Sequence, residues 1–351
     1  MDTVEQLAIQ KMLSSIDTYR ASAMHLSVGN PPMMRVSGKL VPIPDQPILT
    51  PSFMEHLVPT WLDETATEHL RTEKDVTIAR TLENKKRFRI SVFYQQGYVS
   101  ASLTLIPSVI PSLQQLGLSE AAQSLATVPS GLVLIVGPFG SHRSLTLASC
   151  IEHLNQTVQK RIVTIEQPVE YLFTDNRCVI DQREVGVDLH SVAGGLEFAL
   201  EEDVDIVAVS ELDTKESYER ALQLANGGKT VFAVMNTKSV VTSLNMIIHS
   251  FEGADQERIR SELASGIVGI INQREVYTTA GDKRILAEVM IPDDSIRTII
   301  RNGDVFQINN VLYNSREPGL RGLDTVLREA IAQNVITKAE ALVHATDPST
   351  F

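Results

Sequence analysis

The sequence predicts an α/β protein in which a small α+β domain precedes a larger domain with a mainly parallel β-sheet. Apolar, strand-like runs alternate with helical runs after residue 113, which is typical of a parallel sheet covered by helices. The first of these strands leads through a Gly-rich turn into a helix, at residues 132–154. A segment with two prolines, residues 107–113, separates the two patterns. The length of 351 residues is sufficient for two hydrophobic cores.

Residues 1–106 mix short strands with helical segments and are predicted to form the smaller domain. The turn Ser37-Gly38 separates two strand-like runs, as in a hairpin. Residues 51–71 carry apolar side chains at helical spacing, whereas residues 87–93 alternate polar and apolar side chains, as a half-buried strand does. The strands predicted here are residues 33–36, 39–43, 87–93 and 101–106.

Residues 114–351 are predicted to form the larger domain, with residues 107–113 as the linker. Its predicted strands are residues 132–136, 161–165, 205–209 and 230–235, and the helices between them are residues 144–155, 192–202 and 215–225. Residues 244–271 and 295–343 are predicted to be mainly helical. Because open parallel sheets bind ligands beyond the carboxyl ends of their strands, the turn after residue 136 marks the expected site.

The composition argues against several classes of function. A net charge of −12 and a pI near 5.2 argue against general nucleic-acid binding and against a polybasic membrane anchor. No apolar run approaches the ~18 residues of a membrane span, and residues 1–10 lack the layout of a signal peptide. Cys150 and Cys178 lie in apolar segments, so we expect buried free thiols, as in a reducing cytosol, rather than metal ligands.

The Gly-rich turn, residues 137–144, is a variant of the phosphate-binding loop G-x-x-x-x-G-K-[ST]. Gly137 and Ser144 occupy their usual positions, but His142 replaces the second Gly and Arg143 replaces the Lys. A side chain at position 142 costs on the order of 1 kcal/mol if the backbone has a positive φ there. Arginine keeps the charge of lysine but presents a wider, planar fork. The loop therefore predicts the fold of a nucleotide motor with altered phosphate chemistry.

Further motifs along nearly the whole chain resemble those of one protein family. The matching segments are Ala21–Ser27, Pro31–Val36, Phe88–Arg89, Gly131–Leu134, Thr164–Glu166, Asp181–Val185 and Glu202–Ile206. Taken together, they resemble the PilT-type retraction ATPases of bacterial type IV pili, within the broader secretion ATPases. Ser295–Arg301 resembles the C-terminal helix motif of the retraction members, and the four-cysteine zinc site of many extension members is absent from this sequence.

The resemblance implies a PAS-like N-terminal domain followed by a RecA-like P-loop domain. It also implies a hexameric ring, either of identical subunits or mixed with a competent PilT paralogue, which works on the pilus platform protein of the inner membrane. No nucleic-acid partner and no direct membrane insertion are expected, so the protein would be cytoplasmic and peripheral at the inner membrane. The ligand of the family is ATP with Mg²⁺, and no zinc is expected.

The resemblance also assigns roles to residues. The nucleotide contacts would be Gly137, Gly140, Ser141, Arg143 and Ser144. Ser144 and Glu211 would hold Mg²⁺, and Glu211 lies at the end of the Walker B strand. Glu166 would be the general base that polarises the attacking water, although a strand-end carboxylate that merely pairs is an equal alternative. The residues expected to dock a partner are Ile296, Arg297, Ile300 and Arg301.

Other positions of the family pattern carry different chemistry here. Lys229 and Asn236 replace the two histidines of the family's His box. Gly97 and Thr104 stand where arginines of the N-terminal domain reach the phosphates, and an arginine finger can be worth ~10³ to 10⁵ in rate. Gln167 replaces an acidic residue. These substitutions affect separate parts of one site, so a single compensating change would not restore it.

Three functions remain open at this level. The first is a non-hydrolysing or weakly active PilT-like paralogue that regulates or scaffolds the pilus retraction machinery, and the substitutions favour it. The second is a divergent but active ATPase that powers pilus retraction with Arg143 in place of the loop lysine. The third is a sensor that binds nucleotide or another phosphate ligand without cleaving it.

Overall fold

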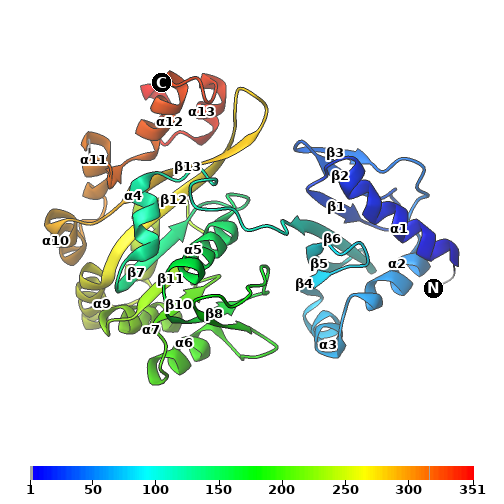
Figure 1. Ribbon diagram of the computed structural model, residues 1–351, viewed down its shortest axis with the longest axis horizontal. Coiled ribbons are helices and arrows are strands. Elements are labelled where there is room, and N and C mark those ends of the chain that lie inside the picture. The colour runs from blue at the N-terminus through cyan, green and yellow to red at the C-terminus, as the bar shows by residue number, and fades with distance from the viewer. Residues whose placement is uncertain (1–2, 316) are drawn as a thin grey trace. The chain divides into compact units, whose positions relative to one another are not determined.

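The computed structural model describes residues 3–315 and 317–351 of the chain (Figure 1). By contacts between Cα atoms, the chain divides into two compact units. The first unit contains Met1–Val109 together with Gln167–Leu172, and the second contains Ile110–Glu166 and Phe173–Phe351. The short segment 167–172 thus leaves the second unit directly after Glu166 and returns to it at Phe173.

The first unit contains an antiparallel sheet with strand order β3-β2-β1-β6-β5-β4. The strands are β1 (Ala23–Leu26), β2 (Met33–Val36), β3 (Lys39–Pro42), β4 (Asp75–Thr81), β5 (Arg87–Gln95) and β6 (Tyr98–Ile106). The helices are α1 (Thr3–Thr18), α2 (Pro51–Leu57) and α3 (Glu64–Glu73). Apolar side chains of all three helices join those of the sheet in one core, for example Met12, Met54 and Leu70.

The predicted hairpin of β2 and β3 and the predicted strands β5 and β6 are confirmed. The helical segment 51–71 is interrupted, because a 3-10 turn at Val58–Thr60 follows α2 and a new helix begins after Asp63. Pro59 lies in that turn, where a missing N–H is tolerated. The Asp63 side chain accepts a hydrogen bond from the Ala66 N–H at 2.9 Å, which caps α3. Strands β1 and β4 and helix α1 were not predicted.

The second unit is built on a mixed sheet with strand order β14-β13-β12-β7-β11-β10-β8-β9. The strands are β7 (Gly131–Val136), β8 (Arg161–Glu166), β9 (Val179–Glu184), β10 (Ile206–Val209), β11 (Thr230–Met235), β12 (Ile267–Tyr277), β13 (Lys283–Met290) and β14 (Leu320–Arg321). Neighbouring strands from β12 to β9 run parallel, whereas β13 and β14 are antiparallel additions. The prediction of a largely parallel sheet is therefore confirmed.

The helices of the second unit include the three that were predicted between its strands, α5, α6 and α7. Their bounds are α4 (Glu120–Ser124), α5 (Arg143–Thr157), α6 (Val192–Glu201), α7 (Lys215–Asn226), α8 (Val240–His249), α9 (Gly253–Gly266), α10 (Asp294–Asn302), α11 (Gln307–Asn314), α12 (Leu323–Ala332) and α13 (Lys338–His344). In the described residues, no helix combines the length and the apolar character needed to cross a bilayer.

The prediction that residues 244–271 are mainly helical is wrong at its end. Helix α9 ends at Gly266, and β12 begins at Ile267 and pairs with β7 and β13. The first half of β12 is buried on both faces, so it shows no alternation that would separate it from a buried helix in sequence. The hairpin of β12 and β13 was therefore missed, whereas the prediction of helices after residue 294 is confirmed.

The central strand β7 is buried along its whole length and supplies side chains to both faces of the sheet. Leu132 and Leu134 lie in one hydrophobic core, and Val133 and Ile135 lie in the other, as the alternation of a strand requires. Cys150 and Cys178 belong to the second of these cores and are free thiols, as predicted. Burial raises the pKa of Cys150 to about 12, so this thiol is unreactive.

Candidate functional site

The candidate site begins where β7 ends and the turn 137–142 leads into α5. Gly137 is the glycine of this turn that packs tightly against other atoms of the protein. A Cβ atom at Gly137 would lie 2.4 Å from the Oγ of Ser141 and 2.7 Å from the backbone oxygen of Gln273. No side chain fits at this distance, so glycine is required by packing within the protein.

The turn is closed by hydrogen bonds of its own. The backbone N–H and the Oγ of Ser141 both donate to the Pro138 carbonyl, at 3.2 and 2.8 Å. The Ser141 carbonyl in turn accepts a hydrogen bond from the Nε2 of Gln273, on β12. Gly140 has a φ of +82°, the left-handed region that favours glycine. Ser141 was expected to contact phosphate, but its N–H and its hydroxyl both donate hydrogen bonds within the turn.

His142 has a positive φ of 60°. A side chain in this left-handed conformation is strained, so the cost stated above for a positive φ at this position applies. Its Nε2 lies 2.5 Å from the Oε1 of Glu275, on β12. Burial disfavours the charged carboxylate of Glu275, but hydrogen bonds from His142 and Lys283 outweigh it and lower the pKa of Glu275. The imidazole is therefore attached to a neighbouring strand by a carboxylate that stays ionised.

Arg143 is the first residue of α5 and is half-buried. Its Nη1 donates to the carbonyl of Gly137 and to that of Met235, both at 2.7 Å. These carbonyls lie at the carboxyl ends of β7 and β11, which are paired in parallel register. The guanidinium therefore joins two strand ends of the sheet. Ser144, the next residue, is half-buried in the first turn of α5.

The acidic candidates lie at the same edge of the sheet. Glu166 is the last residue of β8, and Glu211 follows β10, its neighbour in the sheet. Glu166 is only 8% exposed, and its Oε1 accepts hydrogen bonds from Thr164 at 2.7 Å and from Gln182 at 3.1 Å. Glu211 is exposed. The sheet order thus brings Glu166, Glu211 and the loop to one edge, as predicted for strand-end residues.

Only one of the two positions of the His box lies at this edge of the sheet. Asn236 follows the carboxyl end of β11 and is exposed, whereas Lys229 precedes the amino end of the same strand. The Nζ of Lys229 donates to the Ala199 and Glu202 carbonyls at 2.7 Å, at the end of α6. Lys229 is therefore a helix-end cation, and it cannot take part in chemistry at the loop.

In the first unit, the arginines of β5 hold the segment 167–172. Arg89 pairs with Glu170 at 2.9 Å, and Arg87 donates to the carbonyls of Val169 and Glu170 at 2.7 Å. Gly97 lies in the turn between β5 and β6, and Thr104 lies on β6. Arg89 is thus an ion-pair partner of Glu170 on a half-buried strand, as the alternation of residues 87–93 predicted for that strand.

Two of the residues expected to dock a partner are in the core. Ile296 and Ile300 on α10 are 0% exposed and pack into the core of the second unit. The predicted docking role is therefore wrong for these isoleucines, whose burial fixes the helix. Arg297 donates to the Ala264 carbonyl near the end of α9, and Arg301 is exposed. Of the four residues, Arg301 keeps the most accessible side chain.

Two residues that contact the loop, Gln273 and Glu275, were not identified from the sequence. Both lie on β12, which was predicted to be helical as far as residue 271. The only signal in the sequence is the polar pattern of residues 272–275 within an apolar run, and it does not indicate their partner. Within the described residues, no group of three or more His, Cys, Asp or Glu side chains is arranged to hold a metal ion.

Known proteins resemble this chain over most of its length. The model of the family described as "Type II/IV secretion system protein" matches residues 2–301. The type IV pilus retraction ATPase PilT of Pseudomonas aeruginosa is 30% identical over 343 residues, which are 98% of this chain and 99% of that protein. The type IV pilus ATPase PilU of the same species is 29% identical, and the match covers 97% of this chain and 89% of that protein.

A solved structure agrees with the sequence relatives. The crystal structure of the pilus retraction motor PilT with bound ADP superimposes with a TM-score of 0.85 at 31% identity, covering 98% of each chain. This match confirms the predicted fold class, a RecA-like ATPase domain preceded by a smaller domain. The chain therefore belongs to the type II/IV secretion system protein family and, within it, to the PilT-like ATPases of type IV pilus retraction and twitching motility.

Proposed function

We propose that this chain is a PilT-like protein that regulates or scaffolds the pilus retraction machinery with little or no ATP hydrolysis of its own. The observation that carries the proposal is the position of Arg143. Its guanidinium donates to two backbone carbonyls at 2.7 Å, where a motor needs a cation directed at the β- and γ-phosphates. Moving it to a phosphate would break both hydrogen bonds.

The rest of the donor set supports the same proposal. The Ser141 N–H donates a hydrogen bond within the turn, and His142 stands where the phosphate-binding loop pattern has its second glycine. Gly97 and Thr104 carry no positive charge. Phosphoryl transfer depends on positioning and on covering the charge of the transition state, so these residues do not fit efficient hydrolysis.

The proposal also includes assembly and location. We infer a hexameric ring, formed by this chain alone or together with a competent PilT paralogue, that docks on the pilus platform protein from the cytoplasmic side of the inner membrane. The full-length similarity to PilT and PilU supports this choice of machinery. The exposure of Arg301 at the end of α10 supports a docking role for this residue.

A second candidate is a divergent but active retraction ATPase. It is favoured by Glu166, Glu211 and Ser144, which are retained at one edge of the sheet and would serve as base and Mg²⁺ ligands. The PilT structure with bound ADP shows that this fold holds a nucleotide in a relative. In this candidate Arg143 would leave its carbonyls and hold phosphate, with Gly137 and Gly140 shaping the loop.

The decisive experiment measures calorimetric titration with Mg·ATP and phosphate release on the same preparation. We expect release at background in the wild type and in Glu211→Gln, whereas a competent PilT paralogue, assayed separately as the positive control, should release phosphate. Turnover well above background that Glu211→Gln abolishes would reject the proposal and select the active ATPase. Binding without release would identify the third function, a nucleotide sensor.

A double variant, His142→Gly with Arg143→Lys, tests how much the loop alone limits the reaction. We expect it to gain nucleotide affinity without gaining efficient turnover, because no arginine replaces Gly97 or Thr104. Full turnover of this variant would show that the loop is the only defect.

A further inference from the structure

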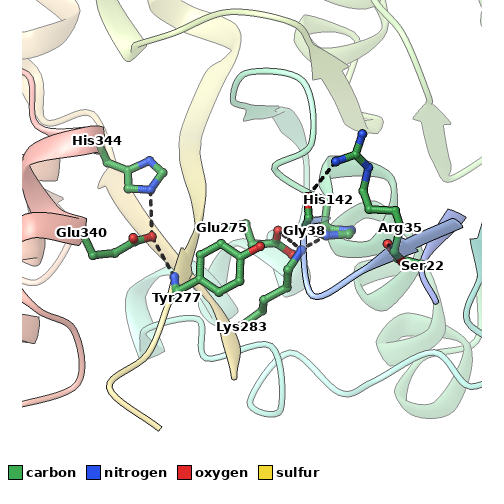
Figure 2. Close-up of polar contacts among 9 residues, drawn as sticks. All are labelled: Ser22, Arg35, Gly38, His142, Glu275, Tyr277, Lys283, Glu340 and His344. Atoms are coloured by element: carbon green, nitrogen blue, oxygen red, sulfur yellow. Dashed lines mark hydrogen bonds and ion pairs between the residues drawn. The ribbon is translucent and has the colours of Figure 1, made fainter. Parts of the chain in front are cut away.

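The contact between His142 and Glu275 is part of a polar chain on one face of the β12–β13 hairpin (Figure 2). The Oε1 of Glu275 lies 2.5 Å from the Nε2 of His142, and its Oε2 lies 2.5 Å from the Nζ of Lys283. Lys283 also lies over the ring of Tyr277, 5.5 Å from its centroid. Each oxygen of one carboxylate thus has its own partner, one in the loop and one in the hairpin.

The sheet register places these groups together. Glu275 and Tyr277 are two residues apart on β12 and share a face, and Lys283 on β13 is directly opposite Tyr277. Lys283 is therefore the diagonal neighbour of Glu275, within reach of a long side chain. The side chain of Glu275 is 19% exposed, against 48% for His142 and 43% for Lys283, so the carboxylate is the least accessible of these three groups.

The outer end of the same strand is also held. The Oε1 of Glu340 on α13 accepts the Tyr277 N–H at 2.8 Å and contacts the Nε2 of His344 at 3.3 Å (Figure 2). Strand β12 therefore pairs with β7 as far as Asn272 and with β13 as far as Tyr277, and its outer end is attached to a helix. A side chain on this strand is a rigid support for whatever it contacts.

The strand contacts the loop at a second point. Gln273 is two residues before Glu275, is fully buried, and donates to the Ser141 carbonyl. Its backbone oxygen limits the space at Gly137. Two residues of one face of β12 thus hold two consecutive residues of the loop, Ser141 and His142.

We infer that Glu275 is a latch: its contact with His142 holds the phosphate loop, residues 137–144, in the conformation described above. This inference rests on the proposed function, because it names what maintains the loop in the form in which Ser141 and Arg143 donate to carbonyls of the protein itself. The consequence for a ligand is that the Nε2 of His142 contacts a carboxylate and is not available to an incoming anion. Removing the carboxylate frees the side chain of residue 142, and the hydrogen bond from Gln273 then remains as the contact of β12 with the turn.

The test is hydrogen exchange of the loop peptide, residues 137–146, in the full-length chain. We expect Glu275→Ala to speed exchange of the loop amides about tenfold, and Glu275→Gln to give a smaller increase because an acceptor remains. Lys283→Met is the matched control, since it removes the other partner of Glu275 without touching the loop, and we expect less than about a twofold change. Peptides of β7 and β11 report whether each variant is folded.

A second measurement follows the melting temperature with and without millimolar Mg·ATP. We expect a larger nucleotide-dependent shift in Glu275→Ala than in the wild type. Loop exchange in both Glu275→Ala and Glu275→Gln at the wild-type rate, with β7 and β11 still protected, would overturn the latch. Phosphate release by the wild type would instead overturn the proposed function, so the two failures are distinguishable.

Discussion

Strand β7 and the loop that follows it are adjacent in sequence but differ in what their side chains do. All residues of β7 are buried, and its neighbours β11 and β12 pair with it in parallel. In the loop, His142 and Arg143 replace the residues on which phosphate binding depends, and both contact groups of the protein itself. Folding free energy comes from buried area, whereas phosphate chemistry depends on a few polar groups, so the second can change while the first is kept.

Two cations sharpen this comparison. Arg143 at the carboxyl edge and Lys229 at the amino edge both donate to pairs of backbone carbonyls. In the family pattern both positions belong to the nucleotide site, but here each holds secondary structure together. The following changes test that reading.

The largest effect is expected in the sheet. Phe232 lies in β11 and is 0% exposed. Phe232→Ala should lower the free energy of unfolding by about 3–5 kcal/mol, because it removes buried apolar surface and leaves a cavity. Urea unfolding followed by the fluorescence of a dye or by circular dichroism measures it. A loss below about 1 kcal/mol would contradict the idea that this core carries the fold.

Arg143→Ala should have the next largest effect. It leaves the carbonyls of Gly137 and Met235 without their donor, at a cost of about 1–3 kcal/mol. Phosphate release should stay at background, and Arg143→Lys, which keeps one charged donor, should lose less stability. If Arg143→Ala left stability unchanged but abolished a measurable affinity for Mg·ATP, Arg143 would be a ligand-binding residue.

Glu288 tests the antiparallel side of the sheet. It is buried on β13, where its Oε2 accepts a hydrogen bond from Asn272 at 2.6 Å, and burial raises its pKa above the ordinary 4.5. The folded state therefore binds the proton more tightly than the unfolded state. The stability from this group is fully present below pH 4.5 and declines as the pH rises through the folded-state pKa, by at most about 1.4 kcal/mol per pH unit.

Glu288→Gln should remove this dependence, and unfolding curves of both proteins across the pH range measure the difference. The variant should gain on the wild type as the pH rises. A parallel pH dependence of the two proteins would mean that Glu288 is not the group responsible.

The smallest effect is expected for Lys229→Met. It removes hydrogen bonds to the Ala199 and Glu202 carbonyls at the half-exposed end of α6, which should cost up to about 1 kcal/mol. Calorimetry with Mg·ATP should give the same result as for the wild type, because Lys229 lies at the amino edge. A changed affinity would place this lysine in the nucleotide site after all.

The parallel sheet, its helices and the family could be read from the sequence. Apolar runs such as residues 132–136 and a Gly-rich turn are local signals, and local signals survive without knowledge of the partner strand. The identity of the loop residues predicted that its phosphate chemistry is altered. The sequence did not predict the hairpin of β12 and β13, because a strand buried on both faces has the same apolar pattern as a buried helix.

The partners of the loop residues followed from strand order and register, which sequence patterns do not encode. His142 and Glu275 are separated by 133 positions, and they meet because β12 pairs with β7. The packing of α10 likewise turned Ile296 and Ile300 into the core, whereas the positions of Lys229 and Asn236 at opposite ends of β11 already followed from the predicted strand, residues 230–235. Periodicity and turn chemistry specify segments one at a time, whereas contacts between distant segments depend on how all of them pack, since each pairing excludes the alternatives.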